Sequence, residues 1–417
     1  MADVDEMSAE YERRLSRRIH ILGIGNVGTF VAHSLKSQPS PPPITLMLHN
    51  PLRYSSWLAG KECLAINTNG LDDIKSGFDV NVFYNENWRS IPISHAEDRS
   101  SVDSPSTTRS TAETEHQPNP ELLGAPEDNG EIECLILTVK APVTVAALQQ
   151  VRHRLTPNST VLFLQNGMGT IDEVNEKVFP NRHRRPHYAV GIFSHGLRRL
   201  QGPFRISHNG VGTTILGPIL PQISRSRASD GGGDKEPDWP LSTKYLLRTL
   251  TLTPPLVAVA EPPSSVLMHQ LEKLAMNSII NPLTALLDCR NGELLHNMSA
   301  TRLMRLLLFE ISSVICSLPE LQSIPGIESR FAPERLLGMA TQLADKTARN
   351  LSSMLQDVRS HQTTEIEYLN GYIVRRGEDL GIKCVVNYTI KHLVLAKQLA
   401  LRQRDSRAIP IDAMDKL

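Results

Sequence analysis

The sequence lacks three features that would each indicate a particular class of protein. Its five cysteines are scattered and form no C-x-x-C pair, which argues against a disulfide framework and a zinc site, so we expect no metal. Lysine plus arginine number 44, and aspartate plus glutamate also 44, so no basic surplus points to nucleic acid. No apolar run approaches the ~20 residues of a membrane helix. These absences favour a protein of a reducing compartment with a small-molecule partner.

The 417 residues are enough for two domains at a usual size of ~150 residues each. Short β-rich runs occupy the first part, and long helical periodicity follows Pro262. We therefore predict an α/β dinucleotide-binding domain over residues 18–261 and an all-α domain over 262–405. A ligand site is expected in the cleft between two such domains.

Four segments are expected to lie outside both cores. Serine, threonine, proline and acidic residues dominate two of them, which predicts disordered insertions at about 85–130 and 221–240. Residues 1–17 mix acids with arginines, unlike an import peptide, and are expected to be a solvated extension. Residues 406–417 are expected to form a C-terminal tail.

A glycine-rich motif, Gly23-Ile-Gly-Asn-Val-Gly28, follows the first predicted strand and precedes a helical pattern. In a dinucleotide-binding turn the first glycine permits the tight turn and the second lets the backbone approach a pyrophosphate. The third lets the helix pack closely on the strand. The spacing alone is a weak signal, and an ordinary strand-to-helix turn is the alternative. The candidate cofactor-binding residues here are Gly23, Gly25, Asn26, Val27 and Gly28.

The residues after the second predicted strand indicate which dinucleotide is bound. That strand covers 44–49, and no carboxylate follows it, whereas NAD-binding folds place one there for the ribose hydroxyls. Arg53 lies nearby and could meet a 2′-phosphate, so NADP is favoured. Three further apolar runs, at 134–140, 161–165 and 188–193, predict buried parallel strands. Lys140 and Asn166 follow two of these runs, where open α/β sheets bind ligands, although Lys140 alone is also compatible with a solvated strand end.

Lys273, Asn277 and Asn281 recur every four residues within a predicted helix over 265–285, so they form one polar stripe. The neighbouring residues are apolar, so this stripe faces either solvent or a ligand. Asparagine is a mediocre helix former, and its use twice favours the ligand. Four further helices are predicted at 300–318, 333–345, 364–380 and 388–404.

Together these motifs resemble those of the ketopantoate reductase (2-dehydropantoate 2-reductase) family, and the two insertions suggest a eukaryotic, fungal-type member. The resemblance covers most of the chain outside its leader and insertions. Six motifs carry it in the family's order: Gly23–Gly28, Thr138–Ala141, Gln165–Gly169, Lys273–Thr284, Asn291–Leu294, and Ser352–Asp357 followed by Thr364–Glu367.

The resemblance implies a Rossmann domain followed by an all-α domain of the 6-phosphogluconate dehydrogenase C-terminal type. It also implies NADPH as hydride donor and reduction of ketopantoate to pantoate in pantothenate and coenzyme A biosynthesis. Lys273 would be the catalytic acid, Asn277 and Asn281 would bind the substrate hydroxyl and carbonyl, and Ser353 its carboxylate. Glu365, expected in the first turn of the helix from Thr364, would hold Lys273 and the substrate in place.

The sequence differs from the family pattern at the residue expected to bind the 2′-phosphate of the cofactor. The family commonly carries an arginine at the tip of the second strand, where this sequence has Asn50, with Arg53 slightly later. Two alternatives remain: a reductase of another branched 2-oxo acid, and a catalytically silent nucleotide-binding protein of the same fold. A monomer or homodimer without nucleic-acid or membrane partners is expected, in the cytoplasm or alternatively in mitochondria.

Overall fold

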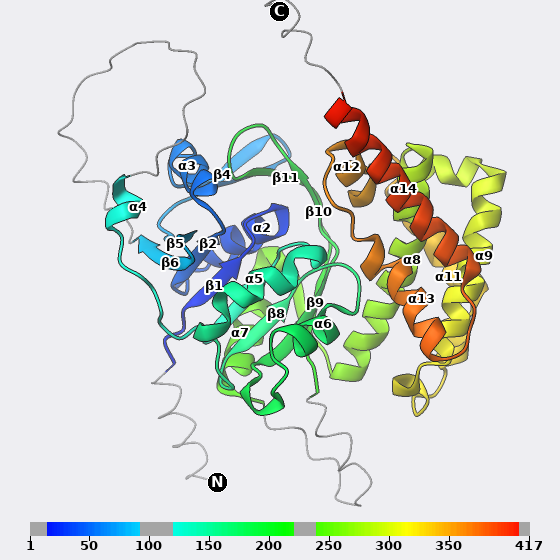
Figure 1. Cartoon of the computed structure of the whole chain (residues 1–417), viewed down its shortest axis with the longest axis horizontal. Coiled ribbons are helices and arrows are strands. Elements are labelled where there is room, and N and C mark those ends of the chain that lie inside the picture. The colour runs from blue at the N-terminus through cyan, green and yellow to red at the C-terminus, as the bar shows by residue number, and fades with distance from the viewer. Residues whose placement is uncertain (1–14, 92–119, 221–238, 408–417) are drawn as a thin grey trace, which may run out of the picture. The chain divides into compact units, whose positions relative to one another are not determined.

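The computed structural model describes residues 15–91, 120–220 and 239–407 (Figure 1). Most of the expected N-terminal extension and of both insertions, and nearly all of the expected C-terminal tail, therefore lie outside the described residues. The chain divides into two compact units. The N-terminal unit contains the residues up to Val139 together with Val145–Gln165 and Asn175–Val266. The helical unit contains everything from Leu267 onward and also Lys140–Thr144 and Asn166–Val174.

A nine-stranded sheet forms the centre of the N-terminal unit, in the order β13-β12-β9-β8-β7-β1-β2-β5-β6. The six strands from β9 to β5 are parallel, while β6 runs antiparallel to β5 and β12 runs antiparallel to β9. The edge strand β13 runs parallel to β12. The predicted parallel strands are therefore confirmed as β7, β8 and β9. The strands are β1 (Ile19–Leu22), β2 (Ile44–Leu48), β5 (Asp79–Tyr84), β6 (Asn87–Ile91), β7 (Cys134–Leu137), β8 (Thr160–Phe163), β9 (His187–Phe193), β12 (Thr214–Pro218) and β13 (Ala258–Ala260).

A second, four-stranded sheet was not predicted from the sequence. Its order is β10-β11-β3-β4, and its strands are β3 (Leu64–Thr68), β4 (Leu71–Lys75), β10 (Gly196–Arg199) and β11 (Arg205–Gly210). Helix α2 (Asn26–Lys36) packs against β1 and β2 of the large sheet and against β3, β10 and β11 of the small one. Every residue of α2 from Gly28 to Leu35 is buried, because protein covers the helix on both sides.

The remaining helices of the N-terminal unit are α3 (Pro51–Ala59), α4 (Pro120–Gly124), α5 (Thr144–Val151) and α7 (Leu241–Thr251). Helix α6 (Thr170–Lys177) is divided between the two units at Val174. Strand β6 and helix α4 fall within the segment expected to be a disordered insertion, so the expectation of disorder is wrong for those residues. Strand β6 is held because Trp88 is only 1% exposed and its indole N–H donates to the Gln150 carbonyl at 3.1 Å. The rest of that insertion, residues 92–119, lies outside the described residues.

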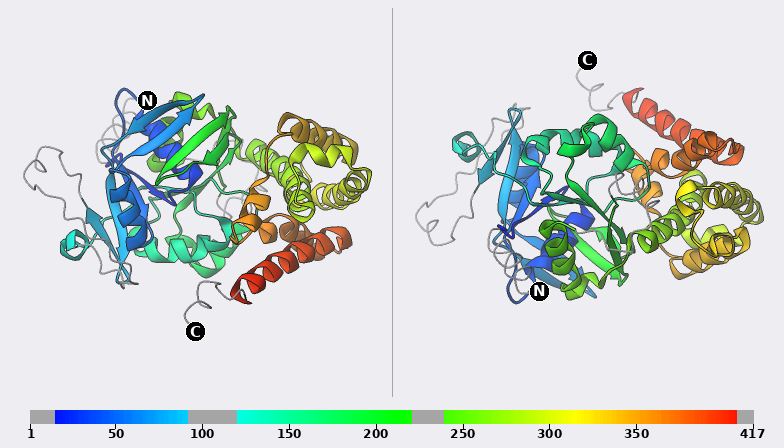
Figure 2. Two further views of the ribbon diagram at one scale, coloured as in Figure 1. Left: turned by 90° about the horizontal axis from the view of Figure 1, so that it is seen from above. Right: turned by 90° about the horizontal axis from the view of Figure 1, so that it is seen from below.

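The helical unit contains α8 (Pro263–Leu287), α9 (Met298–Cys316), α10 (Ile327–Arg330), α11 (Pro333–Lys346), α12 (Ser353–Arg359), α13 (Asn370–Asp379) and α14 (Val385–Arg407). Its core is a single cluster to which α8, α9, α11, α13 and α14 all contribute. Both views of Figure 2 show α14, in red, along one side of this unit. In the described part of the chain, no helix combines the length and apolarity needed to cross a membrane.

One predicted helix is wrong at its start. The pattern predicted a continuous helix from Thr364, but α13 begins only at Asn370, after a short 3-10 turn over Ile366–Tyr368. The backbone leaves the helical region at Leu369, with φ −107° and ψ −99°. Glu365 therefore lies before this turn and is not in the first turn of a long helix.

Candidate active site

The glycine motif forms a tight loop between β1 and α2. Gly23 has φ +106°, and a Cβ there would lie 2.5 Å from the Val139 backbone nitrogen. A Cβ on Gly28 would lie 2.2 Å from the Gly23 carbonyl oxygen, whereas nothing lies within 4 Å of a Cβ on Gly25. The first and third glycines are thus required by the protein's own packing. The second leaves open space at a helix N-terminus that has no acidic residue in its first turn.

Arg53 lies in the first turn of α3, where Asn50 is the N-cap and accepts from the Arg53 backbone N–H at 2.8 Å. The Arg53 guanidinium donates to the Ile24 carbonyl of the glycine loop at 2.8 Å. It also lies over the Phe204 ring, 4.9 Å from the ring centre. Arg53, predicted as a cofactor contact, therefore lies beside the glycine loop.

Helix α8 carries Lys273, Asn277 and Asn281, as predicted from their spacing. The intervening residues Leu274 and Ile279 are buried members of the helical core, whereas the polar stripe is not part of that core cluster. Asn281 is only 8% exposed, yet among the described residues neither its amide nor that of Asn277 has a hydrogen-bond partner in the protein. The side-chain amides of this stripe are therefore free to bind a ligand.

Lys273 is in an environment that suits a proton donor. Burial lowers its pKa to about 8, and the negative charge of Glu365 opposes that decrease. At neutral pH the ammonium is still protonated but gives up its proton more readily than an exposed lysine. A group with a pKa near the working pH is an efficient general acid.

The Glu365 carboxylate is held by two donors from other segments of the helical unit. It accepts from the Ala141 backbone N–H at 3.3 Å and from the Asn166 side-chain amide at 3.2 Å. Burial raises the pKa of Glu365, and these two donors oppose the increase. Glu365 therefore lies beside Asn166, and its charge acts on Lys273. The proximity of Asn166 to Glu365 was not predicted from the sequence.

The loop that carries Asn166 is fixed by its glycines. Gly167 has φ +83°, and a Cβ there would lie 2.5 Å from the Tyr368 carbonyl oxygen. That carbonyl accepts from the Met168 backbone N–H at 2.9 Å, which joins the loop to the turn after Glu365. The glycine thus permits the close approach that brings Asn166 to Glu365.

Lys140 pairs with Asp357 of α12. Burial raises the pKa of Asp357, and the ion pair with Lys140 opposes the increase. The Lys140 side chain remains 45% exposed. It is therefore paired with a carboxylate but still accessible to a ligand.

Ser353, predicted to bind the substrate carboxylate, is the first residue of α12 and is exposed. Its neighbour Ser352 is the N-cap instead, since its hydroxyl accepts from the Leu355 N–H at 3.1 Å and from Thr284 at 2.7 Å. Ser353 is therefore not used by the helix cap.

The sequence reasoning missed two features of this arrangement. Asp357 was assigned no role, although it is the last residue of the Ser352–Asp357 motif, and Arg199, which lies close to Arg53, was not singled out. The signal for Arg199 was weak, because a lone arginine in an unpredicted hairpin looks like an ordinary surface residue.

A parallel sheet with a glycine-rich loop at the carboxyl end of β1, together with a helical unit that carries a lysine of lowered pKa, defines a dinucleotide-dependent oxidoreductase class. Two family models match: "Ketopantoate reductase PanE/ApbA" over residues 19–221, and "Ketopantoate reductase PanE/ApbA C terminal" over residues 265–398. The chain belongs to the ketopantoate reductase family, and the predicted family and fold class are confirmed.

Individual relatives agree. The chain is 29% identical to the "Probable 2-dehydropantoate 2-reductase" of Schizosaccharomyces pombe, covering 92% of this chain and 97% of that one. It is 27% identical to the "Ketoisovalerate reductase BEA2" of Gibberella fujikuroi, covering 88% and 79%. Among solved structures, D-mandelate dehydrogenase in ternary complex with NADH and anilino(oxo)acetate has the same fold. It superposes with a TM-score of 0.64 at 19% identity, over 92% of this chain and 99% of that one.

Proposed function

We propose that this protein is an NADPH-dependent 2-dehydropantoate 2-reductase, which reduces ketopantoate to pantoate for pantothenate and coenzyme A biosynthesis. The observation that carries the proposal is the convergence of Lys273 and Glu365 within the helical unit, with the unpaired amides of Asn277 and Asn281 on the same helix face as the lysine. A positive proton donor beside amide donors suits a 2-oxo acid, which has a carbonyl to protonate and several oxygens to bind.

The residues of the N-terminal unit fit a dinucleotide. Gly23, Gly25, Asn26, Val27 and Gly28 would hold the pyrophosphate at the N-terminus of α2, where open space remains above Gly25. Arg53 would approach the 2′-phosphate, and Lys140 and Asn166, at the ends of β7 and β8, would contact cofactor or substrate. When bound, reduced nicotinamide supplies the hydride that adds to the carbonyl carbon.

The helical unit supplies the proton. Negative charge develops on the carbonyl oxygen during reduction, and the Lys273 ammonium both stabilises that charge and donates its Nζ proton to the oxygen. Glu365 holds the ammonium toward this position through its negative charge, while Ala141 and Asn166 fix the carboxylate. Asn277 and Asn281 would donate to the substrate hydroxyl and carbonyl, and Ser353 would bind the substrate carboxylate.

The test is NADPH oxidation with ketopantoate, ketoisovalerate and a panel of other 2-oxo acids. We expect the highest kcat/KM with ketopantoate. A preference for ketoisovalerate would favour the reductase of another branched 2-oxo acid, as the name of the Gibberella relative suggests. Tight NADPH binding without turnover of any 2-oxo acid would contradict the enzyme and favour a silent nucleotide-binding protein.

Three further expectations accompany this proposal. The assembly is expected to be a monomer or homodimer, which light scattering after gel filtration would distinguish. A cytoplasmic location, with a mitochondrial one as the alternative, is checked by cell fractionation. The expected absence of nucleic-acid partners is checked by electrophoretic mobility with random oligonucleotides.

A further inference from the structure

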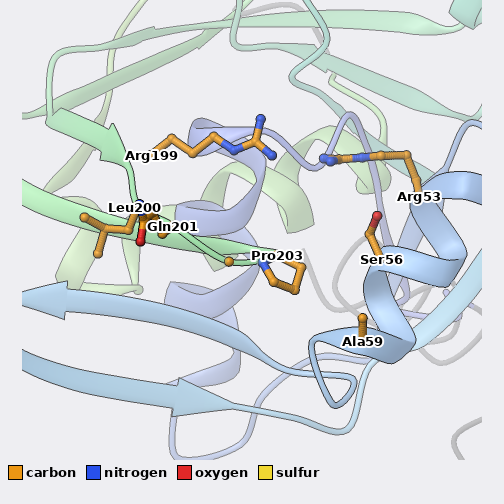
Figure 3. A pocket seen from close by; sticks show the side chains of 8 residues that line it. Arg53, Ser56, Ala59, Arg199, Leu200, Gln201 and Pro203 are labelled. Carbon is orange, nitrogen blue, oxygen red and sulfur yellow. The ribbon is translucent and has the colours of Figure 1, made fainter. Parts of the chain in front are cut away.

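A pocket of about 430 Å³ lies between α3 and the turn that joins β10 to β11 in the N-terminal unit (Figure 3). Arg53, Ser56 and Ala59 line it from the helix, and Arg199 and residues 200–203 line it from the strand end and the turn. No acidic residue is among those that line it. The pocket is thus bounded by two arginines that come from distant parts of the sequence.

The position of Arg53 in this pocket is fixed by the protein. Its guanidinium donates to the Ile24 carbonyl and stacks on the Phe204 ring. Phe204 lies two residues after Gly202, and both have positive φ, +50° for Phe204 and +95° for Gly202, so the tight turn places the ring under the arginine. A guanidinium fixed in this way loses less conformational freedom when it binds an anion.

Arg199 approaches from the opposite side. It is the last residue of β10, where it pairs with Ile206 of β11. Figure 3 shows the two guanidinium groups pointing toward each other across the pocket. Burial, and next the positive charge of Arg199, lower the pKa of Arg53. Among the described residues, neither arginine has a carboxylate partner.

Two like charges that face each other repel, and an anion lying between them would be attracted to both and would relieve that repulsion. We propose that Arg199 is a second specificity-determining residue that, together with Arg53, binds the 2′-phosphate of NADPH and selects it over NADH. The proposal rests on the proposed use of NADPH.

A phosphate monoester suits this pocket better than a carboxylate. It carries close to two negative charges at neutral pH and offers three acceptor oxygens, enough to accept from two guanidinium groups at once. The pocket adjoins the glycine loop through the hydrogen bond from Arg53 to Ile24, so a nucleotide on that loop would reach it. The positive charge that the family commonly places at the position of Asn50 would then be supplied by Arg53 and by Arg199 of the four-stranded sheet.

The experiment measures binding without turnover. Dissociation constants for NADPH, NADH, 2′-AMP, 5′-AMP and inorganic phosphate are determined by calorimetry for wild type, Arg199→Ala and Arg198→Ala. Arg198 is the matched control: it is equally exposed, adjacent on the same strand, does not line the pocket, and points to the opposite face of the strand. We expect Arg199→Ala to weaken NADPH and 2′-AMP binding roughly ten- to a hundredfold and to leave NADH and 5′-AMP unchanged.

Three outcomes would overturn the proposal. The first is equal weakening by the Arg198 and Arg199 variants, and the second is a loss of NADH affinity as large as that of NADPH. Competition by inorganic phosphate without any preference of 2′-AMP over 5′-AMP would also contradict a 2′-phosphate site. Because none of these measurements needs a 2-oxo acid, failure of ketopantoate turnover and failure of this proposal are separate results.

Thermal unfolding distinguishes a phosphate-binding role of Arg199 from a structural one, because the two roles predict opposite changes in the Tm of the nucleotide-free Arg199→Ala variant. Without nucleotide, Arg199→Ala should leave the Tm unchanged or raise it, because the substitution removes repulsion toward Arg53. The upward Tm shift caused by NADPH should become smaller, since the shift depends on affinity. A Tm that falls in the nucleotide-free variant would indicate that Arg199 supports the hairpin instead.

A double substitution tests whether the two arginines bind the same group. If both contact one phosphate, the losses of NADPH affinity from Arg53→Ala and Arg199→Ala will not add in the double variant. Strict additivity would mean that they act at different places, which contradicts the proposal.

Discussion

The sharpest prediction concerns the pH dependence of reduction. With a pKa of about 8, Lys273 carries its proton in about nine molecules of ten at about pH 7 and in about one of ten at about pH 9. If the protonated lysine is the acid, kcat/KM should therefore fall by about tenfold between these pH values. An ordinary lysine with a pKa of 10.5 would give almost no change over the same range.

The assay is the initial rate of NADPH oxidation at saturating NADPH, with ketopantoate varied, from about pH 6 to 10 at constant ionic strength. Lys273→Arg keeps its charge throughout this range, so its slower reaction should lose the decline above pH 8. Lys273→Met should reduce kcat by roughly 10²- to 10⁴-fold at every pH while NADPH affinity stays close to wild type. Asn277→Ala serves as the control: it weakens substrate binding but keeps the same break in the profile.

Two results would refute this reasoning. A wild-type profile that is flat to pH 10 would mean that the proton comes from elsewhere or that chemistry is not rate-limiting, which single-turnover rates would distinguish. A break near pH 8 that persists in Lys273→Arg would assign the titration to another group.

Three further predictions use other parts of the structure. Gly25→Ala should leave the Tm almost unchanged but weaken NADPH binding. Gly28→Ala should lower the Tm, because a Cβ on Gly28, unlike one on Gly25, would clash with the Gly23 carbonyl. Equal Tm values for the two variants would contradict this. Gly167→Ala should reduce kcat more than it weakens NADPH, because the Tyr368 carbonyl must move away; steady-state kinetics with calorimetry checks the split. Burial alone would raise the pKa of Glu272, but two arginines lower it. Glu272→Gln should therefore cost about 1–2 kcal/mol of unfolding free energy at neutral pH, a difference that disappears in urea titrations as pH falls through the lowered pKa of the folded state.

The sign of this last effect follows from the direction of the shift. Arg330 donates two hydrogen bonds to the Glu272 carboxylate, one to each oxygen and both at 3.0 Å, and Arg335 donates a third at 3.0 Å. Because the folded pKa is lowered, the stabilisation is present above the unfolded pKa and is lost as pH falls through the folded one. A difference that grows on acidification would contradict the ion-pair explanation.

The parallel part of the large sheet could be predicted because buried parallel strands are nearly continuous apolar runs, as in Cys134–Leu137. Strand β4 could not, because four of its five residues are exposed and its sequence, Leu71–Lys75, is mostly polar. Such strands are stabilised by pairing with neighbours far along the chain, which no local pattern records.

The same distinction holds for the site. Lys273, Asn277 and Asn281 were found because they share one face of a single helix, so their spacing alone places them together. The helix expected to contain Glu365 was wrong at its start, since the local pattern was helical but α13 begins only at Asn370. The contact of Glu365 with Asn166, which lies 199 residues away in the chain, is recorded by no local pattern. The Arg53 and Arg199 pair was invisible for the same reason, because a hairpin and a helix well over a hundred residues apart have to meet.

The assignment of Lys140–Thr144 and Asn166–Val174 to the helical unit has a consequence for protein engineering. Consider a chimera that joins the helical part of one reductase, from about Pro262 onward, to the N-terminal part of another. It would carry Glu365 from one parent, but the loops that donate to it through the Ala141 N–H and the Asn166 amide would come from the other parent. The buried Glu365 carboxylate would then be surrounded by loops that did not evolve with it. Successful recombination between relatives should therefore require that both short loops travel with the helices.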